Sequence, residues 1–151
     1  RSFLADPRHE SIRDTINAKI KKRELFRPFA PSIKEESAAE FFSDSQPSPF
    51  MTVTLPVRPD QRDRIPAVTH VDGSARVQTV RRADNPRYWN LLDMFEQHTG
   101  VPILLNTSFN IQEPIVCTPE QALATFLESG VDALVMGNYF IERKMVKPFR
   151  W

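Results

Sequence analysis

The feature that most constrains the fold of this chain is the alternation of helix and strand signals along its second half. Two segments, 85–99 and 118–128, begin with a polar residue followed by proline, carry apolar residues at helical spacing and stop before a glycine. Apolar runs, 101–108 and 133–141, follow the two helices, and we predict that both are strands, the second one buried. The alternation predicts an α/β domain with a largely mixed sheet and helices packed on it.

The first half of the chain predicts shorter elements. Asp6-Pro7 is typical of a helix start, and isoleucine then recurs at every fourth residue, which predicts a helix over 7–20. The segment 22–33 should be extended, because its prolines cannot lie inside a helix. We further predict a short helix over 35–42 and strands over 51–57 and 75–80.

The segment 58–66 is unusually polar for its length. It carries three arginines, two aspartates and two prolines, which is too much charge for a buried core. We interpret this segment as a surface loop or a mobile lid that becomes ordered when nucleotide binds.

Length and charge limit the classes of function. The 151 residues fit one domain, and 20 Lys and Arg against 19 Asp and Glu give no general attraction to nucleic acid or anionic lipid, so any anion site must be local. A single cysteine, Cys117, excludes an intrachain disulfide and a cysteine metal cluster. No apolar stretch is long enough to span a membrane. We expect a soluble cytoplasmic protein and, because the chain does not begin with Met, a piece of a longer one.

Polar side chains recur at alternate positions in three segments that we expect to be extended, and alternate residues of a strand share a face. The residues are Lys21, Arg23 and Arg27 in the first segment, Arg76 and Gln78 in the second, and Asn106, Ser108 and Asn110 in the third. A solvated face of an antiparallel sheet is the ordinary explanation of such a pattern. Solvated strands usually carry Thr, Lys and Glu, however, whereas small amides and hydroxyls both donate and accept hydrogen bonds. We therefore predict that these faces hold a ligand.

The cations suggest that the ligand is a polyphosphate, because Lys and Arg supply the contacts that phosphate oxygens require. With four glycines the chain has neither a P-loop nor a dinucleotide fingerprint, so a nucleotide must be held by side chains on strands. His70 and Asp72 precede Arg76 beside a turn glycine, and we assign them to the same site, although a lone histidine is more often structural. We expect His9 and His98 to be structural, and no two histidines have the spacing of metal ligands, so we predict no metal site in this chain.

Four stretches together resemble the C-terminal region of the nodulation and antibiotic O-carbamoyltransferases. They are AKIKKRELFRPFAP at 18–31, THVDGSARVQTV at 69–80, LNTSFNIQEPIV at 105–116 and DALVMGNYFI at 132–141. The opening RSFLADPR resembles the junction after the first domain of those enzymes. The resemblance spans nearly the whole chain, in order, and its motifs are long.

This resemblance implies a YrdC-like fold for residues 7–151, with a twisted, mostly mixed sheet and flanking helices. Residues 1–6 would be the tail of a preceding Kae1-like domain, which carries an iron site and transfers the carbamoyl group to an acceptor hydroxyl. The YrdC-like domain would bind ATP, with its Mg²⁺, and carbamoyl phosphate, and would form carbamoyl-adenylate.

The resemblance also implies roles for individual residues. The K-x-R and S-x-N motifs of the family correspond to Lys21 with Arg23 and to Ser108 with Asn110, which would be catalytic. The residues expected to bind ATP and carbamoyl phosphate are Arg27, His70, Asp72, Arg76, Gln78 and Asn106. Many relatives have a glycine before the Glu-Pro step, whereas 110–114 has none, so we expect a tighter loop and leave the role of Glu113 open.

Two other classes of function compete with this hypothesis. One is a nucleotide- or RNA-binding YrdC-like module without catalysis of its own, and the other is a structural domain of a larger assembly. The near-neutral charge and the lack of an aromatic pair beside the arginines argue against RNA. The acceptor contacts should lie in the preceding domain, so the sequence identifies neither the acceptor nor the oligomeric state.

Overall fold

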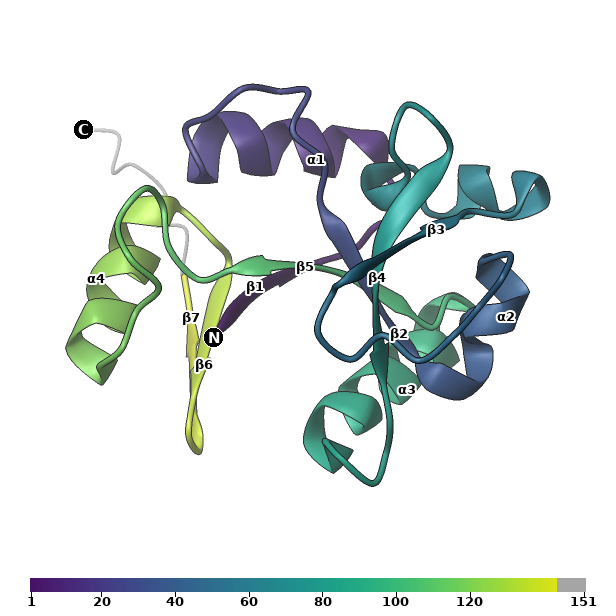
Figure 1. Cartoon of the computed structure of the whole chain (residues 1–151). Coiled ribbons are helices and arrows are strands. Elements are labelled where there is room, and N and C mark those ends of the chain that lie inside the picture. The colour runs from purple at the N-terminus through teal and green to yellow at the C-terminus, as the bar shows by residue number, and fades with distance from the viewer. Residues whose placement is uncertain (144–151) are drawn as a thin grey trace.

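The computed structural model describes residues 1–143 and shows an α/β fold built on a five-stranded mixed sheet (Figure 1). The strand order is β1-β5-β2-β4-β3. The pair β2 and β4 is parallel, and the other three neighbouring pairs are antiparallel. The strands of this sheet are β1 (Ser2–Ala5), β2 (Ala30–Lys34), β3 (Val53–Pro56), β4 (Ser74–Val80) and β5 (Ile103–Ser108).

Helices flank the sheet, with α1 above it, α3 below it and α2 at its lower right in the view of Figure 1. The longer helices are α3 and α4, and the rest of the helical structure consists of short or irregular turns. The α-helices are α1 (Glu10–Thr15), α2 (Ala38–Phe41), α3 (Pro86–Thr99) and α4 (Pro119–Ser129). A π-helical turn (Ile16–Ile20) continues α1, and 3₁₀ turns cover Glu35–Ser37, Pro59–Arg64 and Pro66–Val68.

The two faces of the sheet differ in chemistry, as the alternation in the sequence predicts. Ile33, Val77 and Leu105 lie on one face and are fully buried in the main hydrophobic core. The register pairs Ser32 with Gln78 and with Leu104, so these residues lie on the opposite face. Where α3 does not cover it, that second face is mostly polar, and it carries the candidate site.

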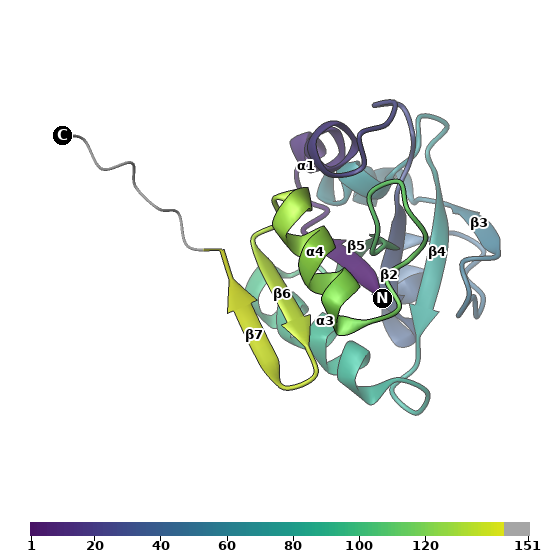
Figure 2. The ribbon, with the colours of Figure 1, turned by 90° about the vertical axis from the view of Figure 1, so that its left-hand side faces the viewer.

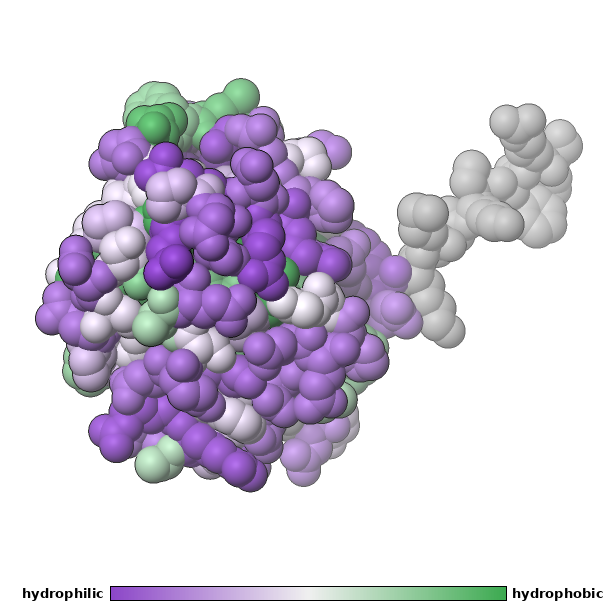
Figure 3. All heavy atoms as spheres, turned by 90° about the vertical axis from the view of Figure 1, so that its right-hand side faces the viewer, coloured by the Kyte–Doolittle hydropathy of each residue, from purple (hydrophilic) through white to green (hydrophobic). Residues whose placement is uncertain are grey.

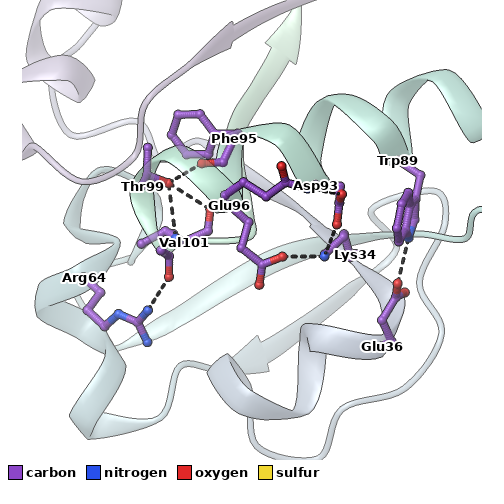
Figure 4. A network of polar contacts seen from close by, with 11 residues as sticks. Lys34, Glu36, Arg64, Trp89, Asp93, Phe95, Glu96, Thr99 and Val101 are labelled. Carbon is purple, nitrogen blue, oxygen red and sulfur yellow. Dashed lines mark hydrogen bonds and ion pairs between the residues drawn. The ribbon is translucent and has the colours of Figure 1, made fainter.

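Helix α3 covers one end of the polar face and is held there by a buried cation (Figure 4). The ammonium of Lys34, with a side chain 9% exposed, is 2.8 Å from Asp93 and also pairs with Glu96. Burial lowers the pKa of Lys34, but the bonds to these two carboxylates outweigh it and raise that pKa above its ordinary value. The indole of Trp89 donates to Glu36 at 2.8 Å, which ties the helix to the turn after β2.

The caps of the two long helices confirm the sequence predictions. The side chain of Asn85 accepts from the backbone N–H of Tyr88, and Thr118 caps α4 in the same way. Gly100 ends α3 in the left-handed conformation at φ 75°, which places the proposed glycine stop where it was expected.

The predicted buried strand over 133–141 is wrong. The segment forms a hairpin of β6 (Ala133–Met136) and β7 (Tyr139–Glu142), a two-stranded sheet of its own that lies beside α4 (Figure 2). Gly137, at φ 61°, makes the turn that breaks the apolar run. Most of the hairpin is exposed, because a two-stranded ribbon leaves one face without a partner.

The predictions for the first 33 residues need three corrections. The helix begins at Glu10 rather than at Pro7, and His9 occupies its N-cap position. Asp6 accepts the backbone N–H of Arg8 at 3.0 Å and pairs with its guanidinium at 2.6 Å, which makes a separate turn before the helix. The segment 22–29 is an irregular loop and not a strand, and Lys22 turns the chain with a φ of 48°. Ser2–Ala5 pair with β5 and so belong to this sheet, which contradicts the prediction that residues 1–6 are the tail of a preceding domain.

The segment 58–66 lies mostly at the surface, as predicted, but it is helical rather than a loop. Most of it forms the 3₁₀ turn Pro59–Arg64, and Ile65 is fully buried in the core. Arg64 donates to the carbonyl oxygen of Gly100 at 2.7 Å and stacks over Phe41. These contacts fasten the segment to the rest of the fold.

Candidate functional site

The floor of the candidate site is a buried group of amide and hydroxyl side chains on the polar face. The amide of Asn106 donates to Ser32 at 3.0 Å and to Gln78 at 2.9 Å, and Ser32 donates to Gln78 at 2.6 Å. These side chains come from β5, β2 and β4, which are neighbours in the sheet. The predicted assignment of Gln78 and Asn106 to one site is therefore geometrically consistent.

Tyr88 of α3 adds a hydroxyl to this floor. Its oxygen is buried and has no hydrogen-bond partner among the described residues. Burial raises the pKa of Tyr88 to about 12, partly offset by Ser32 and Asn106 beside it. A buried hydroxyl without a partner costs free energy.

A cationic pocket of about 290 Å³ lies at the side of the polar face. Arg76 on β4 lies directly across from Thr54 of β3. The loop 22–29 brings two further guanidinium groups to the same pocket, and the turn that precedes β4 brings the imidazole of His70. Its lining residues are Arg23, Arg27, Pro28, Phe29, Thr54, His70 and Arg76. Three guanidinium groups and no carboxylate thus line it, and such an arrangement suits a ligand with several negative charges.

Arg23 is held in place by its neighbours. Its Nε donates to Oδ1 of Asn17 at 2.8 Å, and its guanidinium stacks over Phe29 at 4.7 Å from the ring centroid. Asn17 in turn donates to the carbonyl oxygens of Leu25 and Arg27, which fixes the loop that carries both arginines. Burial, and then the charge of Arg27, lower the pKa of Arg23, so an anion in the pocket would relieve an unfavourable crowding of charge.

The turn before β4 positions His70 and shows a different role for Asp72. Asp72 is exposed and accepts from the backbone N–H and the hydroxyl of Ser74, so it stabilises the turn rather than lining the pocket. The ring of His70 lies 3.4 Å from the Ser74 hydroxyl. Burial lowers the pKa of His70, and Arg76 lowers it further against the opposing effect of Asp72.

Lys21 does not lie on a face with Arg23 and Arg27, contrary to the prediction. Its side chain is buried, and its ammonium, which has three N–H donors, lies within hydrogen-bond distance of four oxygens at the end of β5 and just after it. These are the carbonyl oxygens of Ser108 (2.5 Å) and Asn110 (2.7 Å), Oγ of Ser108 (3.2 Å) and Oδ1 of Asn110 (2.8 Å). Ser108 also donates to Oδ1 of Asn110 at 2.6 Å. The K-x-R and S-x-N motifs therefore meet in space, with Lys21 as the support of Ser108 and Asn110.

Several residues of the site escaped the sequence reasoning. Asn17 lies among the isoleucines of the first helical segment, and a fully buried amide at an apolar stripe is the signal that could have marked it. Ser32 shares its face with Ala30 and Lys34, on a strand of five residues that is too short for the alternation to stand out. Tyr88 looked like an ordinary helix residue, because only the packing of α3 brings it over β2 and β5.

The surface around β3 is strongly hydrophilic. Figure 3 views the side on which β3 and α2 lie, and polar side chains cover most of it, with a group of hydrophobic ones along the upper margin. Within residues 1–143, no group of His, Cys, Asp and Glu side chains is arranged to hold a metal ion. In the same part of the chain, no helix combines the length and apolar character of a membrane span.

Comparison with known proteins shows which family the chain resembles. Residues 1–143 match the family described as "Carbamoyltransferase C-terminus". The chain is 53% identical to the nodulation protein NolNO of Sinorhizobium fredii and 46% identical to the nodulation protein NolO of Bradyrhizobium diazoefficiens, in both cases over its full length. It is 39% identical, over 95% of its length, to a 3'-hydroxymethylcephem-O-carbamoyltransferase of Amycolatopsis lactamdurans.

The match covers a small part of each relative. It corresponds to 23%, 28% and 27% of the lengths of these three proteins. The chain thus spans about a quarter of the relatives that it matches.

Proposed function

Because this chain belongs to the family of carbamoyltransferase C-terminal domains, we propose that it binds ATP and carbamoyl phosphate and forms carbamoyl-adenylate. The observation that carries the proposal is the pocket in which Arg23, Arg27 and Arg76 converge without a carboxylate in the lining. Two polyanions must meet for this chemistry, and fixed cations offset their repulsion. The relative from Amycolatopsis, whose name states an O-carbamoyltransferase activity, supports the same class of reaction.

The pocket and the polar floor would bind different parts of the ligands. The arginines and His70 would hold phosphate groups, because guanidinium groups match the geometry of phosphate oxygens. Gln78 and Asn106 would bind a planar group by hydrogen bonds on the floor. The pocket lining contains no carboxylate that would hold Mg²⁺, so the ion would come with ATP and supply charge neutralisation of its phosphates.

The proposed reaction has two balanced steps. Water cleaves carbamoyl phosphate between the carbonyl carbon and the bridging oxygen, which releases phosphate and carbamate. A carbamate oxygen then attacks the α-phosphorus of ATP, the bond to the β-phosphate oxygen breaks, and pyrophosphate leaves with that electron pair. Ser108 and Asn110, held by Lys21, would contact the α-phosphate as charge develops on it.

Transfer of the carbamoyl group to a hydroxyl would take place in the remainder of a longer protein. The relatives are about four times the length of the part that matches. The acceptor and any iron site belong to that remainder in our proposal. The chain studied alone should therefore complete the activation step and accumulate carbamoyl-adenylate slowly.

The test is the release of pyrophosphate by the chain in the presence of ATP, Mg²⁺ and carbamoyl phosphate. We expect slow release that stops when carbamoyl phosphate is omitted, because carbamate is the nucleophile. Thermal unfolding of the same sample verifies that the chain is folded. A folded chain that binds ATP but gives no release dependent on carbamoyl phosphate would reduce this domain to a nucleotide-binding module.

A further inference from the structure

The carboxylate of Glu113 closes the loop that follows β5. Its Oε1 accepts from the backbone N–H of Ile111 at 3.1 Å, and its Oε2 accepts from that of Gln112 at 3.0 Å. The hydroxyl of Thr125 donates to Oε1 at 3.0 Å. Three donors thus converge on one carboxylate, and no other carboxylate in the part of the chain that the structure describes is held by this loop.

These bonds make the acid stable in its ionised form. Burial raises the pKa of Glu113, but the hydrogen bonds from its own N–H and from those of Ile111 and Gln112, together with Thr125, lower that pKa to about 2. The carboxylate therefore stays charged at any physiological pH. A group held so firmly fixes the backbone to which it is bonded.

Glu113 reaches Asn110 directly through the backbone. The side-chain amide of Asn110 donates to the carbonyl oxygen of Glu113 at 2.6 Å. The other end of the same amide, Oδ1, accepts from Lys21 and from Ser108. Asn110 is thus held at both ends, and its orientation depends on where the Glu113 backbone lies.

Thr125 connects this arrangement to helix α4. It is 6% exposed and faces the core beside Phe126, so its hydroxyl is fixed by the packing of the helix. The neighbouring ion pair between Lys22 and Glu128 also joins α4 to the loop 22–29, but both of its side chains are more than half exposed. An exposed pair contributes little, so Thr125 and Glu113 form the firm link.

We propose that Glu113 is a positioning residue, which acts through Asn110 to orient the Ser108–Asn110 pair toward the reacting phosphate. The effect on catalysis rests on the proposed function. The orientation of Asn110 by Glu113 rests on the hydrogen bonds alone. The proposal assigns a role to Glu113 in the segment 110–114, which contains no glycine. In this chain a carboxylate bound to two backbone N–H groups stabilises the tight turn.

The sharpest variant is Glu113→Gln, because the amide has nearly the same size but its NH₂ group cannot accept from a backbone N–H. We expect kcat for pyrophosphate release to fall about 100-fold, the scale of an ångström-sized misplacement at a reacting centre. The KM for ATP should change less than about 2-fold, because the arginine pocket is untouched. Glu128→Gln, which removes the exposed pair with Lys22, is the matched control and should leave kcat unchanged.

A double variant of Glu113 and Asn110 distinguishes a positioning role of Glu113 from a general loss of stability. If Glu113 acts through Asn110, Glu113→Gln should cost little further activity in an Asn110→Ala background. Additive effects in the double variant, or equal kcat values for Glu113→Gln and Glu128→Gln, would overturn the proposal. So would a KM for ATP that rises by the same factor as kcat falls.

A measurement that does not depend on turnover tests the positioning role separately from the proposed function. Solvent exchange of the Asn110 side-chain NH₂ protons, measured by NMR, should become about 10-fold faster in Glu113→Gln, as expected when a bond of about 1.4 kcal/mol is lost. If the wild-type chain shows no turnover, the proposed function fails, and faster exchange still supports the positioning role. Unchanged exchange in a folded Glu113→Gln chain overturns it.

Discussion

The ammonium of Lys21 lies 2.7 Å from the carbonyl oxygen of Asn110 and 2.8 Å from its Oδ1, although 89 residues separate the two in sequence. The contact joins the end of the first helical segment to the loop after β5. Burial, and then the charge of Arg23, lower the pKa of Lys21 to about 8. Lys21 therefore supports the site, and its substitution should affect stability as well as activity.

Lys21→Met keeps the volume of the side chain and removes the ammonium. We expect it to lower the free energy of unfolding at neutral pH by about 1–3 kcal/mol, because buried carbonyl oxygens lose their donor. The folded pKa of Lys21 lies below the ordinary value of 10.5, so the unfolded chain binds the proton more readily. Wild-type stability should therefore rise between about pH 8 and about pH 10, relative to Lys21→Met. Chemical denaturation across that range measures the difference, and a constant difference would contradict the assigned pKa.

Arg76→Ala tests the phosphate contact most cleanly, because Arg76 is exposed and its loss should not disturb the fold. We expect ATP affinity to fall by about 1.5–3 kcal/mol, the range for hydrogen bonds to charged groups. Arg87→Ala, an exposed arginine at the start of α3, is the matched control and should bind as the wild type does. Calorimetric titration of ATP decides the matter. An equal loss of ATP affinity in the two variants would show that the effect comes from net charge and not from a contact of Arg76.

The pH dependence of phosphate binding should report on His70. Its pKa is lowered in the free protein, and a bound anion would raise that pKa, so binding takes up a proton. Affinity for pyrophosphate should consequently increase from about pH 8 to about pH 6 by more in the wild type than in His70→Gln. The variant corrects for the titration of the phosphate itself. Parallel profiles would show that His70 does not face the ligand.

Gly73 is required by the conformation of the turn before β4. Its φ is 77°, in the left-handed region, and an added Cβ would also push aside the flexible guanidinium end of Arg62. We expect Gly73→Ala to cost about 1–2 kcal/mol for the left-handed backbone, and to weaken phosphate binding by displacing His70. Gly100→Ala, at φ 75° with open space around it, should share the strain but leave binding unchanged. Thermal unfolding and phosphate titration of both variants make the comparison, and equal binding losses would refute the link to His70.

Much of the fold follows from local signals. The caps at Asn85 and Thr118 and the glycines that end α3 and α4 determined both helices, because capping depends on a few adjacent residues. The hairpin in place of one buried strand was missed, because an apolar run looks the same whether it pairs with a central sheet or folds on itself at a glycine.

The site was predicted in part, because the argument from alternating residues holds only for segments that are strands. Alternation correctly placed Arg76, Gln78 and Asn106 on one face, because all three lie on true strands. The same argument failed for Lys21, because the left-handed Lys22 turns the chain and sends the two halves of the K-x-R motif in different directions. Parity applies only while the backbone remains extended.

The most direct test of the central claim is an NMR titration of the chain with ATP and Mg²⁺, with the backbone and arginine side-chain signals assigned. The account predicts the largest shifts at Arg23, Arg27, His70 and Arg76, with smaller shifts at Asn106 on the floor of the sheet. A second, larger cavity of about 1030 Å³ lies between β1, α1, α4 and the β6–β7 hairpin and provides the internal comparison. Shifts centred on that cavity, or saturation with no shift at the arginines, would contradict the assignment of the nucleotide site.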